Sequence, residues 1–338
     1  MHNILTFNNI EKYFNLEAGL FSSFGRFIYA VNGISISIKR GTTYGLVGES
    51  GCGKTTTARM AVGLYTPDKG SINFVSMDGK KYNSETIKKS ELKELRGKIK
   101  YIFQDPSKSL NPRMTIFQIL TSGYRHSKFW PGEKQANIEA EKIMLDVGLA
   151  SEDLQRRPAE FSGGQRQRIS IARALIMKPE FIICDEVVSA LDVSIQSQIL
   201  NLLLDLREKY NLSLLFIAHD LTVTTYFSDR IGVMYRGKIV EEAGALDLAQ
   251  NRIHPYTRLM YSSIPSGSKQ NNKDTKVSLK QVENVNTNSL EFDSSEKLEG
   301  CPFAHRCPYI IDRCKEEIPE LMEVSPGHMS ACFRNGEI

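Results

Sequence analysis

Residues Gly48–Thr55 read GESGCGKT and match the phosphate-binding loop pattern G-x-x-x-x-G-K-[ST]. Thr43–Val47, directly before the loop, reads as a short buried strand, and Thr55–Val62, directly after it, reads as a helix without a breaker. Glycines let the backbone curl until successive amide groups point at phosphate oxygens, at the N-terminus of a helix. The stretch therefore predicts a nucleoside triphosphate site in the setting that such a site needs.

Two side chains of the loop have predicted roles of their own. Lys54 supplies a positive charge for the terminal phosphates, and Thr55 supplies a hydroxyl for magnesium. The residues expected to contact the nucleotide in this segment are Gly48, Glu49, Ser50, Gly51, Cys52, Gly53, Lys54, Thr55 and Thr56.

Length and composition indicate a globular chain. Its 338 residues, 41% of them hydrophobic, can bury a core for one large domain and something smaller. No apolar run reaches roughly eighteen residues, and the first residues lack a signal-peptide pattern, so we expect a cytosolic chain that does not cross a membrane. A net charge of +4 without a dense basic stripe does not indicate nucleic acid as a partner. Six cysteines without a secretory signal favour thiols or metal ligands over disulfides.

The order of strand and helix signals predicts an α/β fold. Ile34–Ile38 alternates with period two, which is typical of a partly exposed strand in an edge sheet. Further along, strands and helices alternate, which favours a largely parallel sheet covered by helices. The alternating segments are a helix over Gly164–Met177, a strand over Phe181–Cys184, a helix over Ser194–Glu208 and a strand over Ser213–Ala218. In the second helix, the residues expected on one apolar face are Ile195, Ile199, Leu202 and Leu206.

Changes in composition predict the domain boundaries. Residues 1–263 form the nucleotide-binding domain, with a helical subdomain at about 106–160 that includes a helix over Gln135–Val147. Residues 264–300 are rich in Ser, Asn, Lys and Gln and read as a polar linker. Residues 301–338 carry four of the six cysteines and are predicted to form a separate small unit.

Two further motifs decide which family the chain resembles. Phe161–Arg168 reads FSGGQRQR, and Phe181–Glu186 reads FIICDE, an apolar run that ends in two carboxylates. Together with the phosphate loop, this combination resembles the ATP-binding-cassette (ABC) ATPases over about Ile4–Arg258, with Ser162–Gln165 as the signature motif. The resemblance implies a P-loop NTPase core of RecA-like fold, an antiparallel edge sheet, an inserted helical subdomain and a small cysteine-rich C-terminal extension.

In that family the signature motif lies on the opposite subunit of a head-to-tail dimer, so each chain makes half of two nucleotide sites. Ser162 can cap a helix, and its hydroxyl, the glycine amides and the positive helix end can meet a γ-phosphate without obstruction. The signature residues expected to contact the nucleotide are Ser162, Gly163, Gly164 and Gln165.

The catalytic residues are expected at the ends of apolar strands. By the resemblance, Asp185 holds magnesium through water, and Glu186 polarises the attacking water as a general base. Gln104 resembles the Q-loop residue that touches magnesium and water, and His219 resembles the switch histidine that contacts the γ-phosphate. Taken alone, each of these side chains has an ordinary structural alternative, such as a cap or a surface position. Val187 departs from the family, which commonly has proline or another small residue there.

Two other positions follow from the same resemblance. Ser189–Asp192 matches the D-loop, which communicates between the two sites of the dimer. The adenine is expected to stack on an aromatic ring just upstream of the cassette strand. Tyr29 is the preferred residue, with Phe24 and Phe27 as alternatives.

Three features resemble the second ATPase of dipeptide and oligopeptide importers. They are Gln165–Ala174 with Cys184–Gln196, the His-Pro-Tyr element within Ile253–Arg258, and the cysteines Cys301, Cys307, Cys314 and Cys332. Four thiolates suit an iron–sulfur cluster or zinc, but their gaps fit neither the common ferredoxin spacings nor paired C-x2-C zinc sites. The resemblance favours a structural [4Fe-4S] cluster over zinc or free thiols. Cys52 and Cys184 have no predicted ligand role.

The sequence therefore predicts the ATP-hydrolysing subunit of an ABC importer for dipeptides or oligopeptides, at the cytoplasmic face of the membrane. Its cofactors would be ATP and Mg2+. Its expected partners are a paralogous ATPase in a heterodimer, two integral-membrane permeases and an extracytoplasmic substrate-binding protein, with no nucleic acid. Alternatives are an importer of nickel or another metal chelate, and a soluble ABC ATPase of repair or translation. An exporter ATPase is disfavoured by the C-terminal cysteines.

Overall fold

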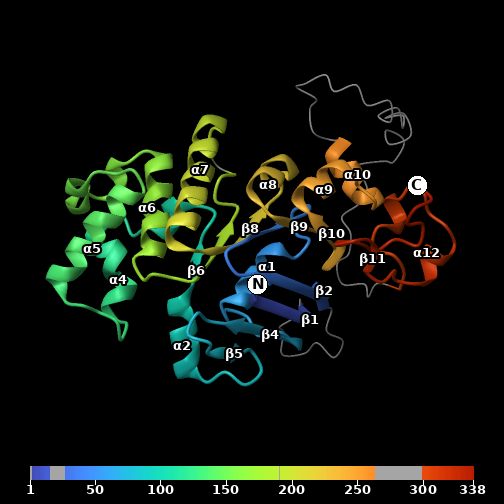
Figure 1. The fold of residues 1–338 in the computed structure, drawn as a ribbon, viewed down its shortest axis with the longest axis horizontal. Coiled ribbons are helices and arrows are strands. Elements are labelled where there is room, and N and C mark those ends of the chain that lie inside the picture. Colours follow the sequence, from blue (N-terminus) through green and yellow to red (C-terminus); the bar gives the residue numbers. More distant parts are fainter. Residues whose placement is uncertain (1, 16–26, 190, 263–298) are drawn as a thin grey trace.

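The computed structural model describes residues 2–15, 27–189, 191–262 and 299–338. Within them, the strands form an antiparallel 4-stranded sheet in the order β2-β1-β4-β5 and an 8-stranded sheet in the order β11-β12-β10-β9-β3-β8-β7-β6 (Figure 1). The strands are β1 Asn3–Asn15, β2 Phe27–Lys39, β3 Thr43–Val47, β4 Lys69–Val75, β5 Lys81–Asn83, β6 Ile99–Ile102, β7 Phe181–Asp185, β8 Ser213–Ala218, β9 Arg230–Tyr235, β10 Lys238–Gly244, β11 Met322–Ser325 and β12 His328–Ser330. The helices are α1 Lys54–Ala61, α2 Lys89–Lys98, α3 Pro106–Ser109, α4 Ile116–Arg125, α5 Glu133–Asp146, α6 Gly163–Leu175, α7 Val193–Tyr210, α8 Leu221–Phe227, α9 Ala245–Gln250, α10 Pro255–Ser262 and α12 Arg313–Glu316, with the 3-10 helices η1 Ser151–Gln155, η2 Pro158–Glu160 and η3 Ala304–Arg306.

The centre of the larger sheet is parallel, as the alternation of strands and helices predicts. β3 pairs in parallel with β8 and β9, and β7 pairs in parallel with β8 and β6. The predicted strands Thr43–Val47 and Ser213–Ala218 are confirmed, and every residue in them is buried. Because helices and the second sheet cover both faces, these strands read as continuous apolar runs. The carboxyl ends of β3, β8 and β7 meet at one edge of the sheet, where the phosphate loop and the paired carboxylates lie.

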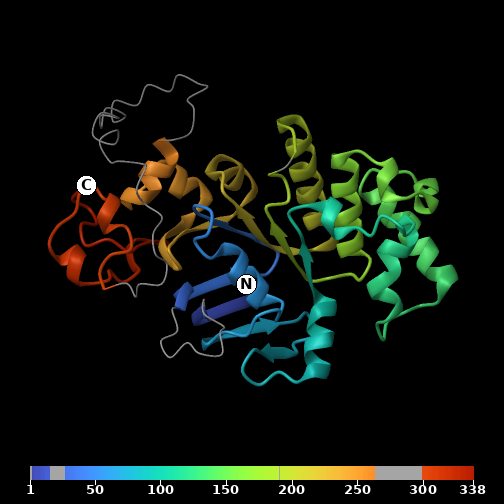
Figure 2. The same cartoon turned by 180° about the vertical axis from the view of Figure 1, so that it is seen from behind.

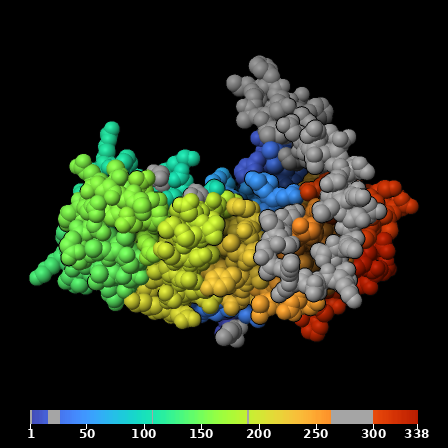
Figure 3. All heavy atoms as spheres, turned by 90° about the horizontal axis from the view of Figure 1, so that it is seen from above, coloured from blue at the N-terminus to red at the C-terminus, as the bar shows by residue number. Residues whose placement is uncertain are grey.

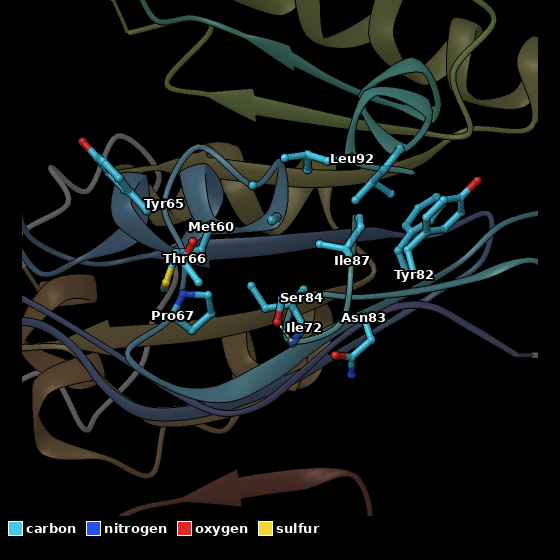
Figure 4. A pocket seen from close by; sticks show the side chains of 14 residues that line it. Met60, Tyr65, Thr66, Pro67, Ile72, Tyr82, Asn83, Ser84, Ile87 and Leu92 are labelled. Carbon is cyan, nitrogen blue, oxygen red and sulfur yellow. Dashed lines mark hydrogen bonds between the residues drawn. The ribbon is translucent and has the colours of Figure 1, made fainter. Parts of the chain in front are cut away.

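Helix α1 packs against the larger sheet on one side and against the smaller sheet on the other (Figure 2). Ile34, Ile36 and Ile38 of β2 are buried, whereas the serines between them are exposed, so the predicted edge-sheet strand is confirmed. A cavity of about 70 Å³ lies between this sheet, α1 and α2, lined by apolar side chains such as Met60 and Leu92 (Figure 4). Small-molecule pockets hold roughly 300 Å³ or more, so this cavity is a packing feature and does not accommodate a nucleotide.

Helices α4, α5 and α6 form a group at one end of the molecule, at the left of Figure 1 and green in Figure 3. α4 begins with a capping box, in which Thr115 accepts a hydrogen bond from the Gln118 amide and the Gln118 side chain accepts one from the Thr115 amide. One side of α4 is apolar and packs on α5 and α6 around Ile119 and Met144. In the described residues, no helix is both long and apolar enough to span a membrane.

The C-terminal segment lies at the other end of the molecule (red in Figure 3) and continues the larger sheet. β12 pairs antiparallel with β10, so that Glu241 lies opposite Ser330, and β11 then pairs with β12. The strands of residues 301–338 therefore extend the larger sheet of the cassette. The predicted linker over 264–300 falls almost wholly outside the described residues.

A buried histidine fastens β12 to the cassette. His328 contacts the Glu241 carboxylate through Nε2 and the Asp247 carboxylate through Nδ1, both at 2.8 Å. Glu241 is fully buried and also accepts hydrogen bonds from the amides of Ile253 and His254. The hydrogen bond to Glu241, with the charges of Glu241 and Asp247, holds the pKa of His328 above its usual value despite burial.

We expect this contact to make stability depend on pH. Because the pKa of His328 is raised by folding, its contribution is complete below the unfolded value of about 6.5 and is lost as pH rises through the folded value. His328→Gln should lower the free energy of unfolding by about 3 kcal/mol in mildly acidic buffer, because Glu241 stays buried without its partner, and by less in alkaline buffer. Urea unfolding of both proteins at two pH values measures the difference.

The control is His2→Gln, which changes an exposed histidine next to β1. His254, whose pKa burial lowers to about 4, acts in the opposite sense, but both proteins contain it. A stability difference that is the same at both pH values would contradict the role given to His328.

Candidate functional site

The predicted phosphate loop joins β3 to α1 and is pressed against neighbouring backbone. A Cβ on Gly48 would lie 2.1 Å from the carbonyl oxygen of Met234, so no side chain fits there. Gly53, at φ 112°, is in a backbone conformation that favours glycine, and a Cβ would lie 2.1 Å from the carbonyl oxygen of Ala30. The glycines therefore let β2 and β9 lie close against the loop. Gly53 is the N-cap of α1, whose positive end faces the loop.

Lys54 is buried and turned back over its own loop. Its Nζ donates hydrogen bonds to the carbonyl oxygens of Gly48 at 2.7 Å and of Glu49 at 2.9 Å. These two contacts hold one positive charge at the mouth of the loop, where a phosphate would approach. A buried ammonium is costly unless carbonyl or anionic oxygens surround it. When a nucleotide binds, its phosphate oxygens can therefore replace the two carbonyl oxygens as partners of the Lys54 ammonium.

The first pair of site residues links the phosphate loop to the end of β7. Thr55 Oγ1 donates to Asp185 Oδ1 at 3.2 Å, across 130 positions of sequence. Asp185 is buried, and its other oxygen accepts a hydrogen bond from the Tyr101 hydroxyl. Burial and the Asp185 charge raise the pKa of Tyr101 well above its usual value, so Tyr101 stays a neutral donor. A threonine hydroxyl and a carboxylate are hard oxygen donors, the kind that Mg2+ takes together with phosphate oxygens.

The second pair joins the ends of β6 and β7. Gln104 Nε2 donates to Glu186 Oε2 at 2.7 Å, and Ser189 Oγ donates to the Glu186 carbonyl oxygen at 2.9 Å. Glu186 has φ 49°, a left-handed conformation that is uncommon for residues other than glycine. Such backbone conformations cluster at active sites, where surrounding contacts enforce them. At Glu186, the left-handed backbone turns the side chain away from the direction of β7, and its carboxylate meets Gln104.

His219 follows β8 directly and is exposed. β8 lies between β3 and β7, and the register pairs Val47 with Ala218 and Asp185 with Ile217. His219 therefore stands one residue beyond the first pair and two beyond the second, at the same sheet edge as the phosphate loop and the carboxylates. The structure brings Lys54, Thr55, Asp185, Glu186, Gln104 and His219 to one edge of one sheet.

The signature motif forms the N-terminus of α6. Ser162 Oγ accepts from the Gln165 amide at 3.3 Å, and Gln165 Oε1 accepts from the Ser162 amide at 2.9 Å. This reciprocal capping box keeps the hydroxyl and the glycine amides on the exposed end of the helix. Gly164 packs against α7, where a Cβ would lie 2.8 Å from Ile195 Cγ2. In Figure 1, α6 stands in the helical group on the left, whereas α1 and the phosphate loop lie at the centre.

Tyr29, the residue preferred for adenine stacking, is a half-buried residue of β2. Its ring centroid lies 6.1 Å from that of Tyr13, and its neighbour Ala30 supplies the carbonyl that packs beside Gly53. Phe27, one alternative, also lies on β2 and packs edge-on against Tyr13. Phe24, the other alternative, lies outside the described residues.

Sequence reasoning missed three side chains that touch the site. Tyr101 bonds to Asp185, as above, and Tyr256 accepts a hydrogen bond from the Glu49 amide at 3.0 Å. Arg306 forms an ion pair with Glu49 at 2.9 Å. Tyr101 stands three residues before Gln104, and Tyr256 belongs to the His-Pro-Tyr element, but nothing in the local pattern around Arg306 indicates a role at the loop.

Residues 31–189 match the family described as ABC transporter, and residues 240–314 match the family described as oligopeptide/dipeptide transporter, C-terminal region. The chain is 44% identical over 330 residues to the oligopeptide transport ATP-binding protein AppF of Bacillus subtilis (strain 168), covering 97% of this chain and 96% of AppF. It is 41% identical over 315 residues to the putative oligopeptide transport ATP-binding protein YkfD of the same organism, covering 92% of each.

Solved structures agree. The ADP conformation of MJ1267, an ATP-binding cassette of an ABC transporter, matches with a TM-score of 0.61 at 26% identity, covering 78% of this chain and 100% of that one. The dimeric post-hydrolysis structure of the cassette MJ0796, bound to ADP and Pi, matches with a TM-score of 0.59 at 27% identity, covering 71% and 98%. This chain therefore belongs to the ABC transporter family, as an ATP-binding ATPase that carries a C-terminal region of the oligopeptide/dipeptide transporter type.

Proposed function

We propose that this chain is the ATP-hydrolysing subunit of an ABC importer that takes up dipeptides or oligopeptides, working at the cytoplasmic face of the membrane. One observation carries the proposal: this chain combines a candidate ATP site with a C-terminal region of the oligopeptide/dipeptide transporter type. In the site, Asp185 is hydrogen-bonded to Thr55, and Glu186 is hydrogen-bonded to Gln104. AppF and YkfD are named as oligopeptide transport proteins, which supports peptides as cargo over a nickel chelate. The relatives give no support to a repair or translation ATPase.

In the proposed mechanism, the side chains at the sheet edge bind ATP and activate water. The phosphate-loop amides and Lys54 hold the β- and γ-phosphates. Thr55 and Asp185 would hold Mg2+, which neutralises charge that develops on the phosphate oxygens when it is bound. Glu186 accepts a proton from the attacking water, and Gln104 orients Glu186 through their hydrogen bond. His219 contacts the γ-phosphate from the end of β8.

The site needs a second cassette in this proposal. Ser162, Gly163 and Gly164 form an exposed helix end, and the hydrogen bonds of Ser162 lie within its own capping box. An exposed helix N-terminus with free glycine amides suits phosphate oxygens supplied by a facing molecule. We infer that a related ATPase completes the site in a heterodimer, with Ser189–Asp192 near the seam and Tyr29 stacking on adenine.

A groove between α2 and the end of α4 is the proposed docking place for the two permeases. A space of about 540 Å³ lies between α2 and the end of α4, lined by Lys93, Lys100, Lys128 and Phe129 among others. Phe129 is 58% exposed, and burial lowers the pKa of Lys100 to about 8. An exposed aromatic ring framed by charges suits a short helix from another protein, with an apolar face and acidic residues. An extracytoplasmic binding protein would deliver the peptide to those permeases.

The proposed division of the chain is a cassette over 1–263 with its helical subdomain at about 106–160, a linker over 264–300 and a cysteine-rich extension over 301–338. Burial raises the pKa of Cys301, Cys307 and Cys332, and the charges of neighbouring cysteines, Cys314 among them, raise it further. In the described residues, no group of three or more His, Cys, Asp or Glu side chains is placed to hold a metal ion.

Four thiols are soft donors of the kind that an iron–sulfur cluster takes, and no step of the mechanism depends on a cluster. We propose a structural [4Fe-4S] cluster in the native chain, with zinc or free thiols as alternatives. Iron, zinc and acid-labile sulfide analysis of anaerobically purified protein separates the three. Absence of iron and sulfide would remove the cluster.

Docking and cargo are tested together. Tagged chain purified from its native membranes should bring down polytopic permeases, and the reconstituted complex should accumulate labelled oligopeptides only with ATP. Phe129→Glu should abolish recovery of the permeases, because it replaces the exposed aromatic ring of the groove with a charge. Leu145→Glu, a change at an exposed position of α5 outside the groove, is the matched control.

The outcomes separate the candidate functions. Uptake of a nickel chelate without uptake of peptides would replace the cargo, whereas stable recovery on DNA or ribosomes would exclude transport. Equal permease recovery with Phe129→Glu and Leu145→Glu would show that the permeases dock elsewhere.

A further inference from the structure

The C-terminal extension makes a direct contact with the phosphate loop. Arg306 ends the short helix η3, and its Nη1 donates to both carboxylate oxygens of Glu49, at 3.0 and 2.9 Å. The two residues are 257 positions apart, so only the fold brings them together. Glu49 is the second residue of the loop, and the mechanism above gives its carboxylate no task.

Aromatic rings hold the guanidinium in place. The Arg306 Cζ lies 6.0 Å from the ring centroid of Tyr235 and 5.8 Å from that of Phe303. Tyr256 packs against both rings, at 4.5 and 5.5 Å, and its hydroxyl accepts the hydrogen bond from the Glu49 amide. Stacking on aromatic faces leaves the Arg fork little freedom. The extension and the His-Pro-Tyr element thus hold Glu49 by its side chain and by its backbone.

The charge of Glu49 explains why such a contact matters. The loop is built to receive a polyanion, and a carboxylate at its second position repels the phosphates unless a cation neutralises it. Arg306 is that cation, and it approaches the carboxylate from the side of the extension. The side chains of Arg306 and Glu49 are 28% and 46% exposed, so solvent and salt limit the effect to a modest one.

We propose that Arg306 is a positioning residue through which the C-terminal extension sets the affinity of the phosphate loop for nucleotide. Arg306 stands immediately before Cys307, and the Ala304 amide donates to the Cys301 carbonyl while the Cys307 amide donates to the Ala304 carbonyl. The turn that carries Arg306 is therefore bounded by two of the extension's cysteines. A change that reorders this turn moves the cation away from Glu49 and weakens nucleotide binding.

The test uses the full-length chain and calorimetric titration with Mg2+-ADP, together with KM and kcat for ATP. Arg306→Ala should weaken binding by about three- to tenfold and raise KM, with kcat little changed, because only the field at the loop is altered. Arg306→Lys keeps a cation and should retain most of the affinity. Lys315→Ala removes the same charge from an exposed site on α12 and should leave binding unchanged.

A double-mutant comparison separates this role from a merely structural one. In a Glu49→Gln background no carboxylate repels the phosphates, so Arg306→Ala should then have little further effect on binding. High salt should reduce the loss caused by Arg306→Ala in the chain that retains Glu49. Unchanged affinity in Arg306→Ala would overturn the proposal, and so would an equal loss with Glu49→Gln, which would mean that Arg306 acts through packing alone.

Discussion

Glu186→Gln is expected to slow ATP hydrolysis by about 10²-fold or more while leaving ATP binding intact, because an amide cannot accept a proton from water at neutral pH. The substitution keeps the shape of the side chain and its position beside Gln104. Bound ATP should then persist, and the two cassettes should stay closed around it. Phosphate release under saturating ATP measures the rate, and size-exclusion chromatography with ATP and Mg2+ measures the trapped dimer.

A matched control for this result is Glu152→Gln, which removes an exposed carboxylate from η1 in the helical group. It should leave turnover unchanged, because Glu152 lies outside the site. Turnover of the Glu186→Gln chain at the rate of the unsubstituted chain would remove Glu186 as the general base. Gln104→Ala is informative beside it: losing the 2.7 Å hydrogen bond should lower kcat without removing the base.

Lys54→Ala is expected to have an effect at least as large as that of Glu186→Gln, but on kcat/KM and nucleotide binding. Removing the ammonium should lower kcat/KM for ATP by about 10²- to 10³-fold, because a preorganised charge aimed at the terminal phosphates is lost. Nucleotide binding should fall as well, unlike in Glu186→Gln. Titration with a fluorescent ATP analogue and steady-state hydrolysis give the two quantities.

The folded conformation of the phosphate loop should also be less stable in the Lys54→Ala chain. The carbonyl oxygens of Gly48 and Glu49 lose their buried donor, at a cost of about 1–3 kcal/mol. Lys134→Ala, which removes one charge from an exposed position of α5, is the control. Wild-type affinity in Lys54→Ala would contradict the role given to the buried ammonium.

Much of the central fold is predictable from local patterns. The strand before the phosphate loop and the strand before His219 run over the predicted residues, because buried parallel strands are continuous apolar runs with clear ends. The helix after the signature motif is confirmed as α6, which begins at the capping box that Ser162 and Gln165 encode. The helix expected over Ser194–Glu208 is longer, Val193–Tyr210.

The buried face of that helix was predicted only in part. Ile199 and Leu206 are buried as expected, whereas Ile195 and Leu202 are only half-buried. Leu200 and Leu203, which the pattern omitted, complete the buried face. The reason is that α7 packs against the sheet and α6 together, so the apolar stripe is wider than one periodic row.

The sequence by itself determined the chemistry of each motif: a glycine-rich turn before a lysine, a serine that caps a helix, and two carboxylates after an apolar strand. These depend on torsion angles, periodicity and capping among neighbours, so a short stretch specifies them. Only the tertiary structure decided which motifs meet. The order and register of β3, β8 and β7 bring Thr55 to Asp185, and the pairing of β12 with β10 brings the extension back to the cassette, where Arg306 reaches Glu49. Contacts between residues so far apart depend on strand order and packing, which no local pattern records.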